Sequence, residues 1–369
     1  MRLICISDRI YSFLKKLEVT LPNFAWNAIY APFPFFFLKN AQLYQLLKES
    51  TRESIPSRFR FEGAPNKTEL SIVEPSNKVT TEYIIFNAVV LPNGAIIADG
   101  KILLQSSIFS KLSFSDYTEI CNLFFKENRP VLNEAVFLPR LINRRGTYGD
   151  YFAEFLVPFA GHNVSKKMPI LFDADFTYNS AISDLPDFGF TNLIRIPQNG
   201  LKVEKLHVKF PNHYFDNFLH RNIDLLRKTL PLSMEVKSPL KVYISRLGYN
   251  AELNNRNRRQ LMNEYEVETF LKSRGFFILR SHEVSNKDSR ILLRYAQMIV
   301  FNHGSGFVNS AWSSVRSVVE IGLSTWWNPF FLKLCHGMGV EKYSLLMAEN
   351  GFLSINRLQA EIEYLENIV

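Results

Sequence analysis

A short turn rich in small residues has the clearest potential for chemistry in this sequence. It reads Asn302-His303-Gly304-Ser305-Gly306 and lies between an apolar run, 298–301, and a helical pattern. Glycine lets the backbone approach a ligand closely, and the N-terminus of a helix attracts phosphate. His303 can add a further hydrogen-bond donor. A Gly-x-Gly turn equally fits tight packing of a strand on a helix, so its surroundings have to decide.

Charged residues stand near the ends of the neighbouring apolar runs. Glu320 lies near the end of the run 318–321, where a carboxylate can receive a ribose diol. Arg246 follows the run 242–245, and Arg259 belongs to an arginine cluster just beyond it. Guanidinium groups bind a diphosphate bidentately and neutralise the charge that grows on it as a leaving group, which could replace a metal ion. Taken singly, Glu320 also fits a helix cap, and the arginines also fit a solvated loop.

The elements that must position these residues alternate between short apolar runs and helical patterns. This alternation is typical of a doubly wound α/β fold. In the second half we expect strands at 241–245, 276–279, 298–301 and 317–321, with helices at 264–274, 289–297, from Gly306 onward, and at 353–369. In the first half we expect paired strands at 83–91 and 95–104 around an Asn-Gly turn, a helix at 150–160, strands at 168–172, 193–196 and 206–209, and a helix at 214–229.

The length of the chain favours two structural units. A chain of 369 residues exceeds the usual size of one compact α/β unit. We expect an N-terminal domain over residues 1–210 and a C-terminal domain over residues 211–369, with a cleft between them. The helix at 353–369 would close the chain.

The net charge of +8 favours anionic partners, such as a nucleotide diphosphate or a phospholipid surface. Nucleic acid is not expected, because no reading motif accompanies the basic residues. The three cysteines match neither a disulfide framework nor metal-ligand spacing, which favours a reducing compartment. The run 24–38 is too short and too broken by proline to span a bilayer, although its phenylalanines leave surface contact open. We therefore expect a cytoplasmic protein, with peripheral contact to a membrane as an open alternative.

Several of these segments together resemble glycosyltransferase family 61. The matching residues are Tyr243-Ile244-Ser245-Arg246, Arg259 with Asn263-Glu264, Gly275-Phe276, Ala296, His303-Gly304-Ser305-Gly306 with Asn309, and Val319-Glu320. Upstream, the segment 146–156 is similar to the family's Asn-Tyr-x-His-Trp-x-x-Glu segment. Thr147 stands there in place of asparagine, and Asp150 in place of histidine.

The resemblance implies a GT-B fold, in which two Rossmann-like domains face each other across a cleft and the C-terminal domain binds the nucleotide. It implies an inverting hexosyl- or pentosyltransferase that uses a nucleotide sugar, UDP-sugar being favoured, and no cofactor or metal. The acceptor would be a glycan or a lipid-linked glycan, in the biosynthesis of a polysaccharide such as capsule or lipopolysaccharide. The donor-binding residues would be Arg246, Arg259, Asn263, His303, Gly304, Ser305, Gly306, Asn309 and Glu320.

Inversion requires one general base, which removes a proton from the acceptor hydroxyl as it attacks. Asp150 and Glu154 lie four residues apart, on one face of an expected α-helix. We favour Asp150 because it replaces the family's imidazole, and we place Glu154 second. Either carboxylate could instead cap the helix or pair with Arg144 or Arg145.

Two other interpretations remain open. Asp173-Ala174-Asp175 follows an apolar strand and has the form in which GT-A enzymes hold a divalent ion against the donor. That interpretation leaves the His303 turn and Glu320 without a role. The second alternative is a non-catalytic module that binds a glycan or a nucleotide, because Asp150 in place of histidine could mark lost chemistry.

Overall fold

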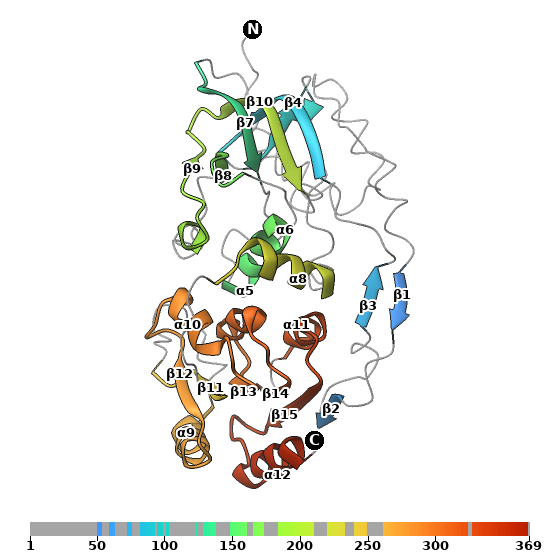
Figure 1. The fold of residues 1–369 in the computed structure, drawn as a ribbon, viewed down its shortest axis with the longest axis vertical. Helices are drawn as coiled ribbons and strands as arrows, with labels where there is room; N and C mark the ends of the chain where they lie inside the picture. The colour runs from blue at the N-terminus through green and yellow to red at the C-terminus, as the bar shows by residue number, and fades with distance from the viewer. Residues whose placement is uncertain are drawn as a thin grey trace, which may run out of the picture.

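The structure is a computed structural model. It describes residues 50–53, 59–62, 72–75, 82–92, 94–98, 101–102, 123, 128–137, 148–160, 165–172, 184–209, 220–232, 240–248, 261–323 and 327–367. Two large sheets with helices between and below them make up an α/β fold (Figure 1). A third, two-stranded antiparallel sheet pairs β1 (Ser50–Glu53) with β3 (Ile72–Pro75).

A six-stranded parallel sheet forms the second half of the molecule. Its strands lie in the order β12 (Phe277–Arg280), β11 (Lys241–Ser245), β13 (Met298–Asn302), β14 (Ser317–Leu323), β15 (Lys342–Ala348) and β2 (Phe59–Glu62). Every residue of β13 and β14 is buried, which is typical of a parallel sheet covered on both faces. The strands expected at 241–245, 298–301 and 317–321 are therefore confirmed.

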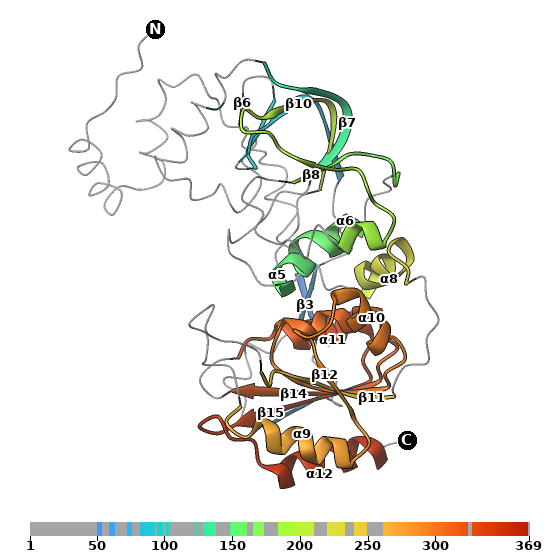
Figure 2. The ribbon, with the colours of Figure 1, turned by 90° about the vertical axis from the view of Figure 1, so that its left-hand side faces the viewer.

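Helices cover both faces of this sheet, as expected for a doubly wound fold. Figure 2 shows α9 (Glu264–Ser273) and α12 (Ile355–Asn367) on one face and α10 (Asn286–Leu293) and α11 (Phe330–Met338) on the other. A 3-10 helix, η7 (Ser305–Trp312), follows β13 after two intervening residues, His303 and Gly304. From β11 the chain first adds β12 on one side and then β13 on the other. The order of the strands thus reverses between β11 and β13.

The first sheet mixes antiparallel and parallel strands. Its order is β6 (Lys101–Ile102), β5 (Ile96–Ala98), β4 (Glu82–Val90), β10 (Leu201–Lys209), β7 (Val131–Phe137), β8 (Ile170–Phe172) and β9 (Leu193–Arg195). The pairs from β6 to β10 are antiparallel, and those from β10 to β9 are parallel. The turn at Gly94, with φ at 86°, brings β4 and β5 together as the Asn-Gly signal predicts. The antiparallel part differs from the wholly parallel sheet of a Rossmann-like domain.

A layer of helices lies between the two sheets (Figures 1 and 2). It consists of α5 (Tyr148–Tyr151), η3 (Phe152–Leu156), α6 (Val157–Ala160) and, packed on α6, α8 (His220–Thr229). The η3 segment is a π-helix, so the backbone hydrogen bonds there span five residues instead of four. The helix expected at 150–160 therefore exists, but its hydrogen bonding changes within it.

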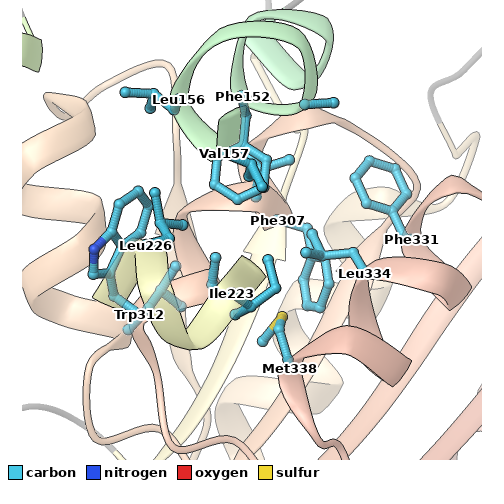
Figure 3. Close-up of a cluster of buried hydrophobic side chains, with 14 of the residues drawn as sticks. Phe152, Leu156, Val157, Ile223, Leu226, Phe307, Trp312, Phe331, Leu334 and Met338 are labelled. Atoms are coloured by element: carbon cyan, nitrogen blue, oxygen red, sulfur yellow. The ribbon is translucent and has the colours of Figure 1, made fainter. Parts of the chain in front are cut away.

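One continuous hydrophobic core joins this helical layer to both sheets. Phe152 and Leu156 of the helical layer lie in one buried cluster with Trp312 and Phe307 of η7, beside α8 and α11 (Figure 3). The same cluster includes Val136 and Ile170 of the first sheet and residues of β11, β13, β14 and β15. A second cluster lies between the six-stranded sheet and helices α9 and α12. The two halves of the described chain are thus packed together through apolar side chains.

The sequence patterns did not indicate α11 or β15, and they did not indicate that β2 joins the second sheet. β15 lies between β14 and β2, so the second sheet includes a strand from the first 210 residues. No helix in the described part of the chain is long and apolar enough to cross a membrane. The run 24–38, where surface contact was left open, lies outside the described residues.

Candidate functional site

The reversal between β11 and β13 places two chemically important segments side by side. The strands are parallel, with Ile244 opposite Phe301, so Arg246 and His303 both follow the carboxyl ends of adjacent strands. In open α/β sheets a ligand binds in the crevice outside these ends, at the point where the strand order reverses. The fold therefore brings the arginine and the small-residue turn to the position where this rule predicts a ligand.

A buried carboxylate organises this end of the sheet. Glu264, the first residue of α9, is 1% exposed and accepts four hydrogen bonds. Its Oε1 accepts from the hydroxyls of Tyr243 and Ser245 at 2.7 and 3.0 Å and from the backbone N–H of Arg246 at 3.0 Å, and its Oε2 accepts from Asn302 Nδ2 at 2.9 Å. Burial, reinforced by Glu264, raises the pKa of Tyr243 well above its ordinary value, so the phenol remains a donor. Glu264 thereby fixes the ends of β11 and β13 relative to each other.

Two glycines of the turn allow close packing against neighbouring side chains. Gly304 has extended backbone, with φ at 176°. A Cβ there would lie 2.5 Å from Arg246 Nη1, which donates to His303 O at 3.1 Å. A Cβ on Gly306 would lie 2.4 Å from Ser281 Oγ. These glycines are therefore required by close approach and not by a left-handed backbone.

The turn ends at the N-terminus of η7. The N–H of Phe307 makes the first turn of this helix by donating to Gly304 O at 3.2 Å. The N–H groups of Ser305 and Gly306 precede that bond and have no acceptor within the helix. The N-terminus of a helix also contributes partial positive charge. Beside it, Ser281 Oγ and Asn302 Oδ1 are buried without a hydrogen-bond partner among the described residues.

His303, the residue after β13, and Glu320 of the adjacent strand β14 form a buried pair. The imidazole Nδ1 contacts Glu320 Oε1, and since a carboxylate only accepts, Nδ1 carries the hydrogen. Glu320 is 0% exposed and also accepts from Trp327 Nε1 at 2.9 Å and from the hydroxyl of Tyr343. Burial together with Glu320 raises the pKa values of Tyr343 and Cys335 well above their ordinary values. The carboxylate of Glu320 is enclosed by the protein and orients His303. The expected contact between Glu320 and a ribose stays a prediction.

Two of the expected donor-binding residues make structural contacts away from the turn. Asn263 exchanges hydrogen bonds with the backbone of Leu353, at 2.9 and 3.0 Å. Asn309 is 1% exposed, accepts from the Tyr148 hydroxyl at 2.9 Å and donates to Asn286 at 3.3 Å. In this conformation both amides connect elements of the fold.

The carboxylates that we expect to act as a base lie on the helical layer. Asp150 belongs to α5 and is half-buried, and α5 packs against η7. Glu154 lies in the π-helix η3, and its side chain is not among those that the structure describes. The i,i+4 relation that places two residues on one face of an α-helix does not carry over unchanged to a π-helix.

Other residues of the hypothesis fall outside the described chain. Arg259 does, and so do Asp173 and Asp175, the pair of the metal-dependent alternative. Their placement therefore stays a prediction.

Sequence reasoning missed the organising role of Glu264 and the contributions of Ser281 and Tyr343. Glu264 follows Asn263 in the matching segment, and an acidic residue at a helix start predicts no more than a favourable dipole interaction. Its true partners lie 18 to 38 residues away along the chain. Apart from the position of Glu264 next to Asn263, no local pattern in the sequence could have identified these partners.

The fold and the site together define an α/β protein in which a glycine turn and Arg246 meet at the reversal of a parallel sheet. The family model described as Glycosyltransferase 61 matches residues 124–319, which is more than half of the chain. The chain belongs to glycosyltransferase family 61, as the resemblance of its motifs indicates. Membership indicates glycosyltransferase activity, with a sugar donor and a glycan acceptor in general terms. No curated protein matches the chain closely enough to count as a relative.

Proposed function

We propose that this protein transfers a sugar from a nucleotide-diphosphate donor, UDP-sugar being favoured, to a glycan or lipid-linked glycan with inversion at the anomeric carbon. The observation that carries the proposal is the position of Arg246 against Gly304 at the N-terminus of η7. A guanidinium, a glycine turn and a helix N-terminus converge there at the reversal of the sheet. Each of these groups favours a diphosphate.

The donor diphosphate would lie over the turn, with the N–H groups of Ser305 and Gly306 directed at its oxygens. Arg246, together with Arg259, would neutralise the charge that grows as the glycosidic bond breaks. His303, held through Nδ1 by Glu320, would donate from its other nitrogen. The role of Glu320 in this scheme is to orient the imidazole. Because the arginines, His303 and the helix N-terminus neutralise the diphosphate, the scheme needs no metal ion.

The acceptor, which is the glycan or lipid-linked glycan, would approach from the side of the helical layer. A general base there removes the acceptor proton while the hydroxyl attacks opposite the diphosphate. We assign this role to Asp150, because α5 packs against the helix that begins at the donor turn. Glu154 is the second choice. Asn263 and Asn309 support the donor site through Leu353 and Tyr148.

The wider setting of the reaction follows from the same scheme. The doubly wound second sheet, opposed by a helix that carries the base, supports a GT-B type of arrangement with the nucleotide on the C-terminal half. The +8 charge suits a cytoplasmic enzyme that works near an anionic membrane surface. Polysaccharide biosynthesis on a lipid carrier is the process we propose.

A thermal-shift screen tests the donor. A ligand that binds only the native state raises the melting temperature, so UDP, GDP, CMP and their common sugars can be compared directly. We expect UDP or a UDP-sugar to give the largest rise. Arg246→Ala should weaken binding of that nucleotide about tenfold or more, or about 1.4 kcal/mol.

Arg129→Ala is the matched control. Arg129 is also a part-buried arginine that donates to backbone carbonyls, at 2.8 and 2.6 Å, but it lies beside the first sheet. The Arg129→Ala variant should have a lower melting temperature than the parent and the same nucleotide affinity. Equal nucleotide affinity in the two variants, or a parent protein that no nucleotide stabilises, contradicts the proposal.

A further inference from the structure

A buried polar network lies where the helical layer meets the second half of the molecule. It consists of Tyr148 of α5, Asp184, Arg290 of α10 and Asn309 of η7, here called the Tyr148 network. Arg290 Nη1 donates to Asp184 Oδ2 at 3.0 Å and to the Tyr148 oxygen at 3.2 Å. The Tyr148 hydroxyl lies 2.9 Å from Asn309 Oδ1 and 3.0 Å from Asp184 Oδ2. The network thus joins residues that are up to 161 positions apart in the sequence.

The network is enclosed to a degree that is unfavourable for charged groups. Arg290 is 0% exposed and Asp184 is 3% exposed. The guanidinium lies near the rings of Phe188 and Trp312, at 5.0 and 5.3 Å from their centroids, and the two rings stack on each other at 5.8 Å. A buried ion pair is weak evidence for stability, because apolar residues of similar volume often stabilise a core equally well. A role in fixing one arrangement of the helices accounts for it better.

The network connects the two segments that the proposed reaction requires. Asn309 lies in η7, the helix that starts at the donor turn, and Tyr148 lies two residues before Asp150. Apolar contacts also join the helical layer to η7, such as the edge-to-face pair of Phe152 of η3 and Trp312 at 5.9 Å. Apolar packing tolerates small shifts, whereas hydrogen bonds of defined length and angle do not.

The hydroxyl group of Tyr148 connects the other three members of the network. It has one hydrogen and two acceptors in reach, Asn309 Oδ1 and Asp184 Oδ2. Asp184 also accepts from Arg290, so it keeps a partner without the phenol. Asn309 Oδ1 has Tyr148 as its hydrogen-bond donor among the described contacts, and losing a partner is costly for a buried amide. Burial raises the pKa of Tyr148 well above its ordinary value, so the hydroxyl remains a donor at working pH.

We propose that Tyr148 and Arg290 are positioning residues, which hold the helix carrying the general base in register with the helix that starts at the donor turn. This inference rests on the proposed function, since it assigns the network to the spacing of base and donor. Arg246 and the turn 302–306, which would bind the diphosphate, are not members of the Tyr148 network. Its loss should therefore reduce turnover and leave nucleotide binding intact.

The test uses Tyr148→Phe, which removes one oxygen and keeps the ring. Phe190→Leu is the control, because Phe190 packs edge-to-face on Phe159 in the same core at 4.9 Å and carries no hydrogen-bonding side-chain atom. The first readout is hydrogen–deuterium exchange of the full chain without ligand. Tyr148→Phe should speed exchange in both 148–160 and 305–312. Phe190→Leu should leave 305–312 unchanged, even where it lowers the melting temperature as much.

The second readout is kinetic. We expect Tyr148→Phe to bind UDP within about twofold of the parent and to lower kcat about tenfold, the size of one lost orienting contact. Arg290→Lys should behave likewise, because lysine cannot replace the planar fork. Unchanged exchange in 305–312, or an unchanged kcat in an active preparation, overturns the inference. A parent that binds no nucleotide contradicts the proposed function instead, and the exchange result then decides the coupling by itself.

Discussion

The imidazole of His303, which directly follows β13, is held by the carboxylate of Glu320 on the adjacent parallel strand β14. The backbone N–H of His303 also donates to Ile321 O at 2.9 Å, so both the ring and the main chain of the histidine are fixed. An oriented imidazole at the end of a strand is a prepared hydrogen-bond donor, because its direction does not have to be set when the ligand arrives.

Glu320→Gln should weaken both folding and nucleotide binding. The amide NH₂ would face one of the three donors that the carboxylate now accepts from, so a buried group loses its partner at a cost of about 1 to 3 kcal/mol. We expect a lower melting temperature and a weaker affinity for UDP. Glu361→Gln is the control, since Glu361 is also buried and accepts from Ser344 on the side of α12. Equal UDP affinity in the two variants would show that Glu320 does not serve His303.

Gly304→Ala should reduce nucleotide affinity with little loss of stability. The added methyl would lie 2.5 Å from Arg246 Nη1 and displace the guanidinium, while the extended backbone accepts alanine without strain. Gly275→Ala should show the opposite pattern. Gly275 has φ at 82°, so alanine is strained there by about 1 kcal/mol, at the far end of α9. Calorimetry of UDP binding and melting of both variants checks this crossed result.

Asp150→Asn should lower kcat about 100-fold or more and leave the UDP dissociation constant nearly unchanged, because a base acts only in the chemical step. Glu154→Gln is the direct comparison. Transfer at the parental rate by Asp150→Asn, together with loss in Glu154→Gln, would move the role to Glu154. Single-turnover kinetics separates this loss from any change in product release.

Chelation should leave activity in place. The proposed donor site uses arginines, a histidine and a helix terminus where other transferases use a divalent ion. We expect full transfer after dialysis against EDTA. Loss that added Mg²⁺ or Mn²⁺ restores would favour the alternative in which Asp173 and Asp175 bind a metal.

The pair of Glu268 and Arg280 should make stability depend on pH. Burial raises the pKa of Glu268, but the two hydrogen bonds from Arg280, at 3.0 and 2.7 Å, and its positive charge lower it by more, so the net pKa lies below the ordinary 4.5. A lowered carboxyl pKa contributes stability above the unfolded value and loses it as pH falls through the folded one. The stability difference between parent and Glu268→Gln should therefore be largest near neutral pH and shrink below about pH 4.5. A difference that grows on acidification contradicts this sign.

The sequence by itself determined the order of elements around the site. Short apolar runs and glycine turns are local signals, so β11, β13 and β14, the turn at His303 and the helix after it were all predictable. The family motifs follow from the same local segments. The expected i,i+4 pairing of Asp150 and Glu154 could not be certain, because a π-helical turn depends on how the helix packs.

Only the tertiary structure decided which polar groups are buried together. Glu264 and Glu320 bind partners from separate strands and loops, and Tyr148 meets Asn309 from 161 residues away. The mixed first sheet and the core shared by both halves likewise depend on pairings between distant segments. Hydrogen bonding and burial act through space, so a pattern read along the chain can name the residues of such a site but not their partners.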